Sequence, residues 1–196
     1  MEPRVTTLLL AAGQSRRMGT CKQLLPLGER TAVDRCLEAL ASAGIGVIVA
    51  VVSPGSDEVA EEVRRHPVIL AVNEVAACDM ADSVRTGLRH IPAATTAVIV
   101  ALADHPLVAP DTYRILAARH AIEPDAIIIP VHDGKKGHPT LFPRPLLEEL
   151  AGLPTMRDVI RHHHDKIRLL PVADEGVVLE MDVWEDYERL IERNGA

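Results

Sequence analysis

Short apolar runs and amphipathic segments alternate along the whole chain. The runs predict strands or extended segments at residues 5–10, 47–52, 68–72, 97–103, 127–131, 140–142, 167–172 and 177–181. Continuous apolar runs of this length are typical of strands buried on both faces. Between them, apolar residues recur at helical spacing and predict helices at residues 31–43, 57–65, 80–91, 110–121, 145–150, 156–163 and 184–192. We therefore expect the α/β class, as a three-layer α/β/α Rossmann-like fold with a mostly parallel central sheet.

Turn residues separate these segments without dividing the chain into parts. Gly44 follows the predicted helix at residues 31–43 as a stop signal, and residues 53–56 read Ser-Pro-Gly-Ser. Residues 132–138 contain two glycines, two lysines and two histidines, so we expect a functional or flexible loop there. The sequence has no repeat, low-complexity tract or long linker. We expect one domain over residues 1–196.

Composition and charge exclude several classes of partner. The chain has a formal net charge of −7, whereas a general nucleic-acid or membrane surface needs a basic face. Aromatic residues make up only 2% of the sequence, which leaves little for stacking on bases. No apolar run is long enough to span a bilayer. We expect no nucleic-acid partner and no membrane partner.

The cysteines and the N-terminal segment point to a reducing compartment. The three cysteines are scattered, and none forms a C-x-x-C pair: Cys21, Cys36 and Cys78. This pattern does not favour a disulfide framework or a zinc site. Residues 5–12 resemble the apolar part of a signal peptide, but the stretch is short and an arginine pair follows closely. We interpret it as a core strand and expect a cytoplasmic protein.

The segment after the first strand, residues 10–22 (the signature loop), is the most informative part of the chain. It combines small residues and two glycines with three cations, Arg16, Arg17 and Lys22. Small residues let backbone N–H groups approach an anion closely, and the cations neutralise several negative charges, as a polyphosphate requires. The loop has neither the G-x-x-x-x-G-K-[ST] nor the G-x-G-x-x-G pattern. Plain turn glycines with a solvated cationic rim are the alternative interpretation.

Two carboxylates are expected near this loop. In open α/β sheets, ligands bind beyond the carboxyl ends of the strands. Asp104 follows the predicted strand at residues 97–103, and Asp182 follows the run at residues 177–181. Mg²⁺ takes one or two carboxylates together with phosphate oxygens and water. As alternatives, Asp104 caps the turn before Pro106 and Asp182 caps the final helix.

The string L-A-A-G-Q-S-R-R-M-G-T-C-K at residues 10–22 resembles the nucleotidyltransferase signature L-A-A-G-x-S-x-R-M-G-x-x-K. The chain is most similar to the molybdenum cofactor cytidylyltransferase-like group within the nucleoside-diphosphate-sugar type of transferases. The resemblance covers most of the chain and is thinnest between residues 143 and 172. It implies a Rossmann-like fold and Mg²⁺ as the cofactor.

The resemblance also implies roles for particular residues. Arg17 and Lys22 are the expected catalytic residues, and Asp104 and Asp182 the expected metal ligands. The nucleotide-binding residues implied by the signature loop and by a later S-x-x-x-G-L string are Leu10, Ala11, Ala12, Gly13, Ser15, Arg16, Met18, Gly19 and Ser83. His138, in a Gly-His-Pro triplet, and the nearby Lys135 are the expected acceptor-binding residues.

Some positions depart from the family pattern. His105 stands where related enzymes carry Gln or Met, and Asp82 adds an anion close to Ser83. The late motif D-x-D-T-P-E-D reads Glu-Met-Asp-Val-Trp-Glu-Asp at residues 180–186. Asp182 is kept there, although its neighbours differ. Asp82 either weakens nearby phosphate contacts or caps its helix.

These observations predict a Mg²⁺-dependent nucleotidyltransferase. A phosphorylated acceptor attacks the α-phosphorus of a nucleoside triphosphate, and pyrophosphate leaves. Ala12 is typical of cytidine-using members, so CTP is favoured over GTP, and the resemblance implies a molybdopterin acceptor and a molybdoenzyme or its maturation factor as protein partner. Three alternatives stay open: a sugar- or polyol-phosphate nucleotidyltransferase, a non-catalytic molybdenum cofactor carrier, and a nicotinamide-dependent oxidoreductase, against which the missing G-x-G-x-x-G counts.

Overall fold

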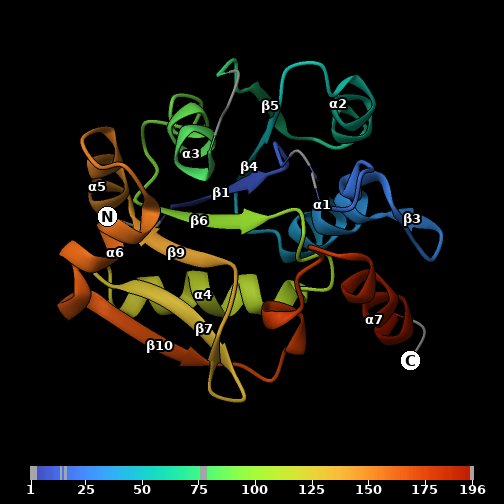
Figure 1. Ribbon diagram of the computed structural model, residues 1–196. Coiled ribbons are helices and arrows are strands. Elements are labelled where there is room, and N and C mark those ends of the chain that lie inside the picture. Colours follow the sequence, from blue (N-terminus) through green and yellow to red (C-terminus); the bar gives the residue numbers. More distant parts are fainter. Residues whose placement is uncertain (1–3, 14, 16, 76–78, 195–196) are drawn as a thin grey trace.

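The computed structural model of the protein describes residues 4–13, 15, 17–75 and 79–194. Its central sheet has the strand order β10-β7-β9-β6-β1-β4-β5, and β8 pairs with β7 at one side (Figure 1). The strands are β1 Val5–Leu10, β4 Val47–Val52, β5 Ile69–Val72, β6 Ala97–Leu102, β7 Ile127–His132, β8 Lys135–Lys136, β9 Thr140–Pro143 and β10 Ile167–Pro171. β9 runs antiparallel to β6 and β7, whereas β1, β4, β5, β6, β7 and β10 pair in parallel where they meet. The predicted three-layer, mostly parallel α/β fold is confirmed.

Helices cover both faces of this sheet (Figure 1). They are α1 Ala32–Ala43, α2 Asp57–Arg64, α3 Met80–Leu88, α4 Pro110–Ile122, α5 Arg144–Glu148, α6 Met156–His162 and α7 Trp184–Asn194. Buried residues of α1, α2 and α4 form one core with the sheet, and those of α3, α5 and α6 form a second core on its other face. Within the described ranges, none of these helices is long and apolar enough to cross a membrane.

Helix α7 packs outside these two layers. Its Tyr187 and Leu190 share a small core with Met18 of the signature loop and with Leu27. Leu27 belongs to a separate two-stranded sheet of β2 Pro26–Leu27 and β3 Arg30–Thr31. The Tyr187 hydroxyl donates to the Pro26 carbonyl over 2.6 Å. The end of the chain is therefore packed against the segment that follows the signature loop.

Local signals place the helix ends close to where the sequence predicts them. Thr31 caps α1 by accepting from the Asp34 amide, and Gly44 ends it in the left-handed region at φ 66°. Asp79 and Asp82 form a capping box at the start of α3. Asp82 therefore caps its helix, which was one of its two predicted roles. α3 ends at Leu88, three residues before the predicted end.

Two predicted segments differ in the structure. Residues 177–181 are not a strand, because the chain forms a 3₁₀ turn at Glu175–Val178 and pairs with loops: the Val177 carbonyl accepts from the His138 amide. Residues 132–138 are not a plain loop, because β7 continues to His132 and turns into β8. Asp133 and Gly134 make that turn with φ of 48° and 77°, as a tight hairpin requires.

Candidate functional site

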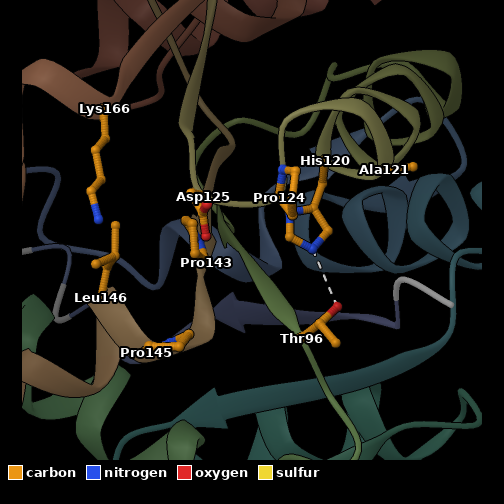
Figure 2. Close-up of a pocket in the computed structure, with 9 residues that line it drawn as sticks. All are labelled: Thr96, His120, Ala121, Pro124, Asp125, Pro143, Pro145, Leu146 and Lys166. Atoms are coloured by element: carbon orange, nitrogen blue, oxygen red, sulfur yellow. Dashed lines mark hydrogen bonds between the residues drawn. The ribbon is translucent and has the colours of Figure 1, made fainter. Parts of the chain in front are cut away.

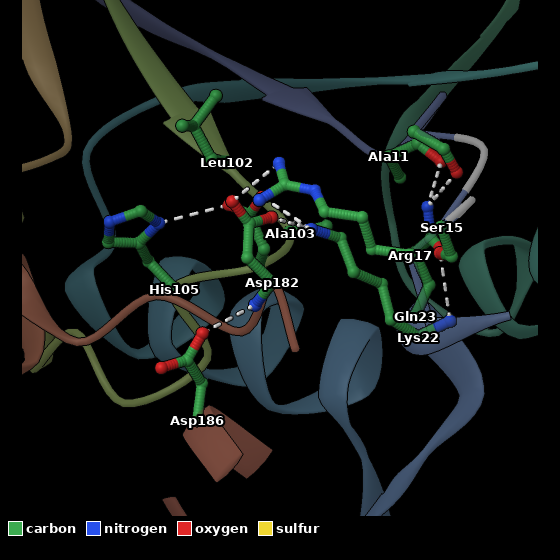
Figure 3. Close-up of polar contacts among 12 residues, drawn as sticks. Ala11, Ser15, Arg17, Lys22, Gln23, Leu102, Ala103, His105, Asp182 and Asp186 are labelled. Carbon is green, nitrogen blue, oxygen red and sulfur yellow. Dashed lines mark hydrogen bonds and ion pairs between the residues drawn. The ribbon is translucent and has the colours of Figure 1, made fainter. Parts of the chain in front are cut away.

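The signature loop is held at the carboxyl end of β1 by Ser15 within it and by Gln23 directly after it. Gln23 is buried, and its amide group donates to the carbonyls of Ala11 (3.1 Å) and Gly13 (2.7 Å). The Ser15 hydroxyl accepts from the Lys22 amide over 3.0 Å (Figure 3). Gln23 received no role in the sequence analysis. The sequence signals Gln23 only as a polar residue directly after Lys22. In the structure, its side chain holds the loop by hydrogen bonds to two backbone carbonyls.

The remaining residues of the loop divide between core and surface. Leu10, Ala11, Ala12 and Met18 are buried, whereas Gly13 and Gly19 are exposed. Gly19 lies in the left-handed region at φ 67°, and Ser15 adopts a positive φ of 48°. Arg16 lies outside the described residues. Residues 10–12 are thus packed in the core, whereas Gly13 is exposed.

Four charged side chains from distant parts of the sequence converge beside this loop (Figure 3). The Lys22 ammonium lies 2.8 Å from Asp104 Oδ2 and 2.9 Å from Asp182 Oδ1. The Arg17 guanidinium lies 3.0 Å from Asp182 Oδ2. Asp104 follows β6, and Asp182 lies two residues before α7. The structure thus brings together the predicted catalytic pair and the predicted metal ligands.

The mutual contacts of Lys22 and Asp104 favour the charged form of each side chain. Burial by itself lowers the pKa of Lys22, but the carboxylates of Asp104 and Asp182 outweigh burial and raise that pKa. Burial likewise favours a neutral Asp104, yet contacts with His105 and Lys22 hold the pKa of Asp104 well below its usual range. Lysine and carboxylate are therefore both charged near neutral pH. Two positive and two negative charges face one another with no net charge.

A second aspartate fixes the backbone around Asp182. Asp186 Oδ2 accepts from the amides of Asp182 and Val183, each over 3.2 Å. The Asp182 carboxylate itself faces Lys22 and Arg17. The amide groups of the two residues just before α7 are therefore satisfied by Asp186, while the Asp182 carboxylate is directed at the cations. From the sequence, Asp182 is a candidate cap of the final helix and Asp186 has no assigned role.

Two histidines border Asp104 on the side away from Lys22. His105 Nδ1 lies 3.0 Å from Asp104 Oδ1, and the His105 ring meets the His138 ring edge-on with centroids 5.2 Å apart. Burial, followed by the neighbouring His105, lowers the pKa of His138 to about 4. Among the described residues, this cluster of contacts includes His138 but not Lys135, which is exposed on β8.

Ser83 lies in a buried polar network at the start of α3. Its hydroxyl accepts from the Asn73 amide group over 3.2 Å and lies 3.3 Å from the Asp79 carbonyl. Asn73 is fully buried and also accepts from Thr86. Ser83 therefore joins α3 to the segment after β5, and its predicted contact with nucleotide stays a prediction.

The donor set at this site fits a magnesium ion that arrives with phosphate. Across residues 4–13, 15, 17–75 and 79–194, no group of three or more His, Cys, Asp or Glu side chains is placed to hold a metal. Asp104 and Asp182 instead offer two hard carboxylate ligands that converge on one cation, Lys22. Mg²⁺ is commonly held by one or two carboxylates and completed by phosphate oxygens and water.

Figure 2 shows a separate pocket of about 430 Å³. It lies near the amino ends of β6 and β7, whereas Asp104 follows the carboxyl end of β6. It is lined by Thr96, His120, Ala121, Pro124, Asp125, Pro143, Pro145, Leu146 and Lys166. The Thr96 hydroxyl donates to the Arg4 carbonyl, so His120 Nε2 is the donor in its 3.2 Å contact with that hydroxyl. None of the sequence-predicted site residues lines this pocket.

Comparison with known families decides the classification. The model of the MobA-like NTP transferase domain matches residues 7–167, which include the signature loop and Asp104. The chain belongs to this family. The prediction of a nucleotidyltransferase is thereby confirmed at the level of the MobA-like family, and the fold agrees with it.

Individual relatives of this MobA-like chain are distant. It is 24% identical over 195 residues to the molybdenum cofactor cytidylyltransferase of Escherichia coli, covering 96% of each chain. It is 30% identical over 129 residues to the bifunctional protein GlmU of Rhodospirillum rubrum, covering 64% of this chain and 28% of GlmU. The chain thus spans little more than a quarter of the GlmU relative.

Solved structures share the whole fold with this MobA-like chain. Rv0371c from Mycobacterium tuberculosis is 29% identical, has a TM-score of 0.82, and the match covers 98% of this chain and 99% of that one. Rv0371c has also been solved in complex with manganese. A divalent ion is therefore a ligand of at least one relative with this fold.

Proposed function

We propose that the protein is a Mg²⁺-dependent cytidylyltransferase. In the proposed reaction, a phosphorylated acceptor takes CMP from CTP and pyrophosphate is released, with molybdopterin as the acceptor. The observation that carries the proposal is the convergence of Lys22 and Arg17 on Asp104 and Asp182, with nitrogen–oxygen distances of 2.8–3.0 Å. Residues 1–196 act as one catalytic domain in this proposal, and its setting is the cytoplasm.

The chemistry follows from charge. An anionic acceptor and a triphosphate repel each other, so catalysis consists mainly of neutralisation and alignment. One acceptor oxygen forms a bond to the α-phosphorus as the bond from that phosphorus to the pyrophosphate oxygen breaks. Arg17, which is exposed, neutralises the leaving phosphates, and Lys22 stabilises the charge that develops at the α-phosphate. No protein nucleophile is required.

Asp104 and Asp182 are the residues that would hold Mg²⁺. When bound, the ion supplies charge neutralisation between phosphate oxygens. Asp104 reaches the site directly from β6, and its second oxygen contacts His105. Asp182 is directed to the same point by the backbone contacts of Asp186. The two ligands are thus held by different parts of the fold.

The base and the acceptor are supported by different observations. For CTP, the support is Ala12 in the signature loop, which by resemblance is typical of cytidine-using members, together with the likeness to the E. coli cytidylyltransferase. For a phosphorylated pterin, the support is the same likeness and the position of His138 beside the Asp104 cluster. A molybdoenzyme or its maturation factor is then the protein that receives the product.

A sugar-phosphate nucleotidyltransferase is the second candidate function. The observation that favours it is the signature loop itself, because the pattern at residues 10–22 also resembles the nucleoside-diphosphate-sugar type of transferases. This candidate uses the same cluster of charges with another acceptor. A non-catalytic cofactor carrier would have no need of Lys22 between two carboxylates.

Pyrophosphate release distinguishes these functions. The protein is supplied with Mg²⁺ and each of CTP, GTP, ATP and UTP, and with molybdopterin or a sugar 1-phosphate as acceptor. We expect release with CTP and molybdopterin, and loss of release in Asp104→Asn. Release with a sugar 1-phosphate alone would support the second candidate. Tight binding of molybdopterin without release under any condition would overturn the enzyme proposal in favour of a carrier.

A further inference from the structure

All four oxygens of the two proposed metal ligands already have a nitrogen partner. In Asp104, Oδ2 lies 2.8 Å from the Lys22 ammonium and Oδ1 lies 3.0 Å from His105 Nδ1. In Asp182, Oδ1 lies 2.9 Å from the same ammonium and Oδ2 lies 3.0 Å from the Arg17 guanidinium. A divalent ion that binds both carboxylates must therefore displace Lys22, because Lys22 is the cation shared by both.

The two displaceable cations differ in what displacement costs. The Arg17 side chain is 69% exposed, so water solvates it when it leaves Asp182. The Lys22 side chain is only 10% exposed. Moving its ammonium away from both carboxylates leaves a desolvated charge without a partner, and this is strongly unfavourable. A free metal ion cannot stabilise the displaced ammonium, because both carry a positive charge.

A triphosphate changes this balance because its oxygens supply new partners for the displaced ammonium. We propose that Lys22 is a resident counter-ion of the Asp104–Asp182 pair, which excludes free divalent ions and admits a metal only together with a nucleoside triphosphate. The substrate of the site is then the metal–nucleotide complex, and Lys22 moves from carboxylate to phosphate as that complex enters. This inference rests on the proposed function.

A role of Lys22 confined to phosphate binding makes a different prediction. In that case, the nucleotide-free protein binds a divalent ion equally well with or without Lys22. If Lys22 is the resident counter-ion, its removal exposes two carboxylates that lack a shared partner. Metal affinity in the absence of nucleotide then rises, even though the lysine is lost for catalysis.

Manganese is the probe, and the free Mn²⁺ signal in electron paramagnetic resonance is the readout. Nucleotide-free wild-type protein is titrated beside Lys22→Met, Arg17→Met and Lys166→Met. Lys166 lines the pocket across the sheet, so its variant carries the same loss of charge far from the carboxylates. We expect Lys22→Met to bind Mn²⁺ about tenfold or more tightly than wild type, since two carboxylates that have lost their shared ammonium attract a divalent ion more strongly. Arg17→Met should have a smaller effect, and Lys166→Met none.

A second measurement uses the wild-type protein alone, in case Lys22→Met does not fold by circular dichroism. Mn²⁺ is titrated with and without a CTP analogue that has a methylene bridge between the α- and β-phosphates. We expect protein-bound Mn²⁺ only with the analogue. Equal Mn²⁺ affinity with and without it, or no gain in a folded Lys22→Met, would overturn the counter-ion role. If wild type binds the Mn²⁺–analogue complex under no condition, the proposed function fails instead.

Discussion

The Met181 amide donates a hydrogen bond to the Asp104 carbonyl over 2.9 Å. This single backbone contact sets the two proposed metal ligands beside each other, because Asp182 follows Met181 directly. The segment that carries Met181, residues 174–182 (the crossing segment), is fixed further back by Asp174, which accepts from Ala109 and Thr112. The site is therefore assembled partly by backbone contacts between loops.

Substitution of Gly176 by alanine should disturb the crossing segment. A Cβ atom at Gly176 would lie 2.2 Å from the Leu107 carbonyl oxygen, so the backbone must move. We expect Gly176→Ala to lower the free energy of unfolding by about 1–3 kcal/mol, measured by urea denaturation, and to lower turnover through a displaced Asp182. Gly152→Ala is the control, because its Cβ would meet its nearest atom at 3.8 Å. Equal stability of the two variants would contradict this packing.

Removal of Lys22 should affect the chemical step. We expect Lys22→Ala to lower kcat by about 10²–10³-fold, because the lysine stabilises charge that develops in the transition state. Steady-state pyrophosphate release at saturating CTP measures the effect. Lys166→Ala, which removes a lysine across the sheet, should retain wild-type kcat. Near-normal kcat in Lys22→Ala would show that the ammonium does not act on the reacting phosphate.

Removal of divalent ions should abolish turnover without affecting the fold. With excess chelator we expect no pyrophosphate release, and full recovery when Mg²⁺ is added, since the ion neutralises phosphate charge. Thermal unfolding of the nucleotide-free protein should be unchanged by the chelator, because Lys22 and Arg17 already neutralise the two carboxylates. Asp104→Asn should not be rescued by added Mg²⁺. Turnover that persists in chelator would refute the metal requirement.

Acid should destabilise the protein partly through His138. Burial and the nearby His105 lower the pKa of His138 from 6.5 to about 4 in the folded chain. Between these values the unfolded chain binds more protons, so the free energy of unfolding decreases as the pH falls from 6.5 towards 4. Well above pH 6.5, His138 is neutral in both the folded and the unfolded chain, so it no longer changes the free energy of unfolding with pH.

The corresponding experiment compares wild type with His138→Asn. Urea denaturation at several pH values should show a steeper loss in wild type, with a difference of about 2 kcal/mol accumulated across this range. Asp104 does not obscure the effect of His138 in this pH range. The pKa of Asp104 is held well below its usual range, so its contribution to the free energy of unfolding is lost only at more acidic pH. Parallel pH profiles for the two proteins would mean that His138 titrates normally.

Much of the fold follows from local sequence. The strands at Val5–Leu10 and Val47–Val52 match the predicted ranges, because a short continuous apolar run is typical of a strand buried on both faces. Residues 177–181 carry an equally apolar pattern, yet their partners lie in loops that are distant in sequence. The apolar pattern predicts which residues are buried, but it does not predict which backbone groups form hydrogen bonds with each other.

The same distinction holds in the site. The signature loop, Asp104 and Asp182 are visible in the sequence as motifs, and the structure brings Arg17 and Lys22 to both carboxylates. Gln23 and Asp186 act by hydrogen bonds to backbone groups, and the sequence does not reveal these bonds, although Asp186 closes the late motif at residues 180–186. The sequence predicts both carboxylates near this loop, and the structure adds that one ammonium, that of Lys22, contacts both of them.

The reversed direction of β9 determines where the proposed acceptor-binding residue His138 lies. Because β9 runs against β6, the residues that precede β9 emerge at the edge where β6 ends. His138 is delivered to Asp104 in this way; a parallel strand at the same position would have carried it to the far edge of the sheet. The β7–β8 hairpin can therefore change in length and charge while the pairing of the other strands stays fixed. One inverted strand gives the proposed acceptor side an independently variable loop.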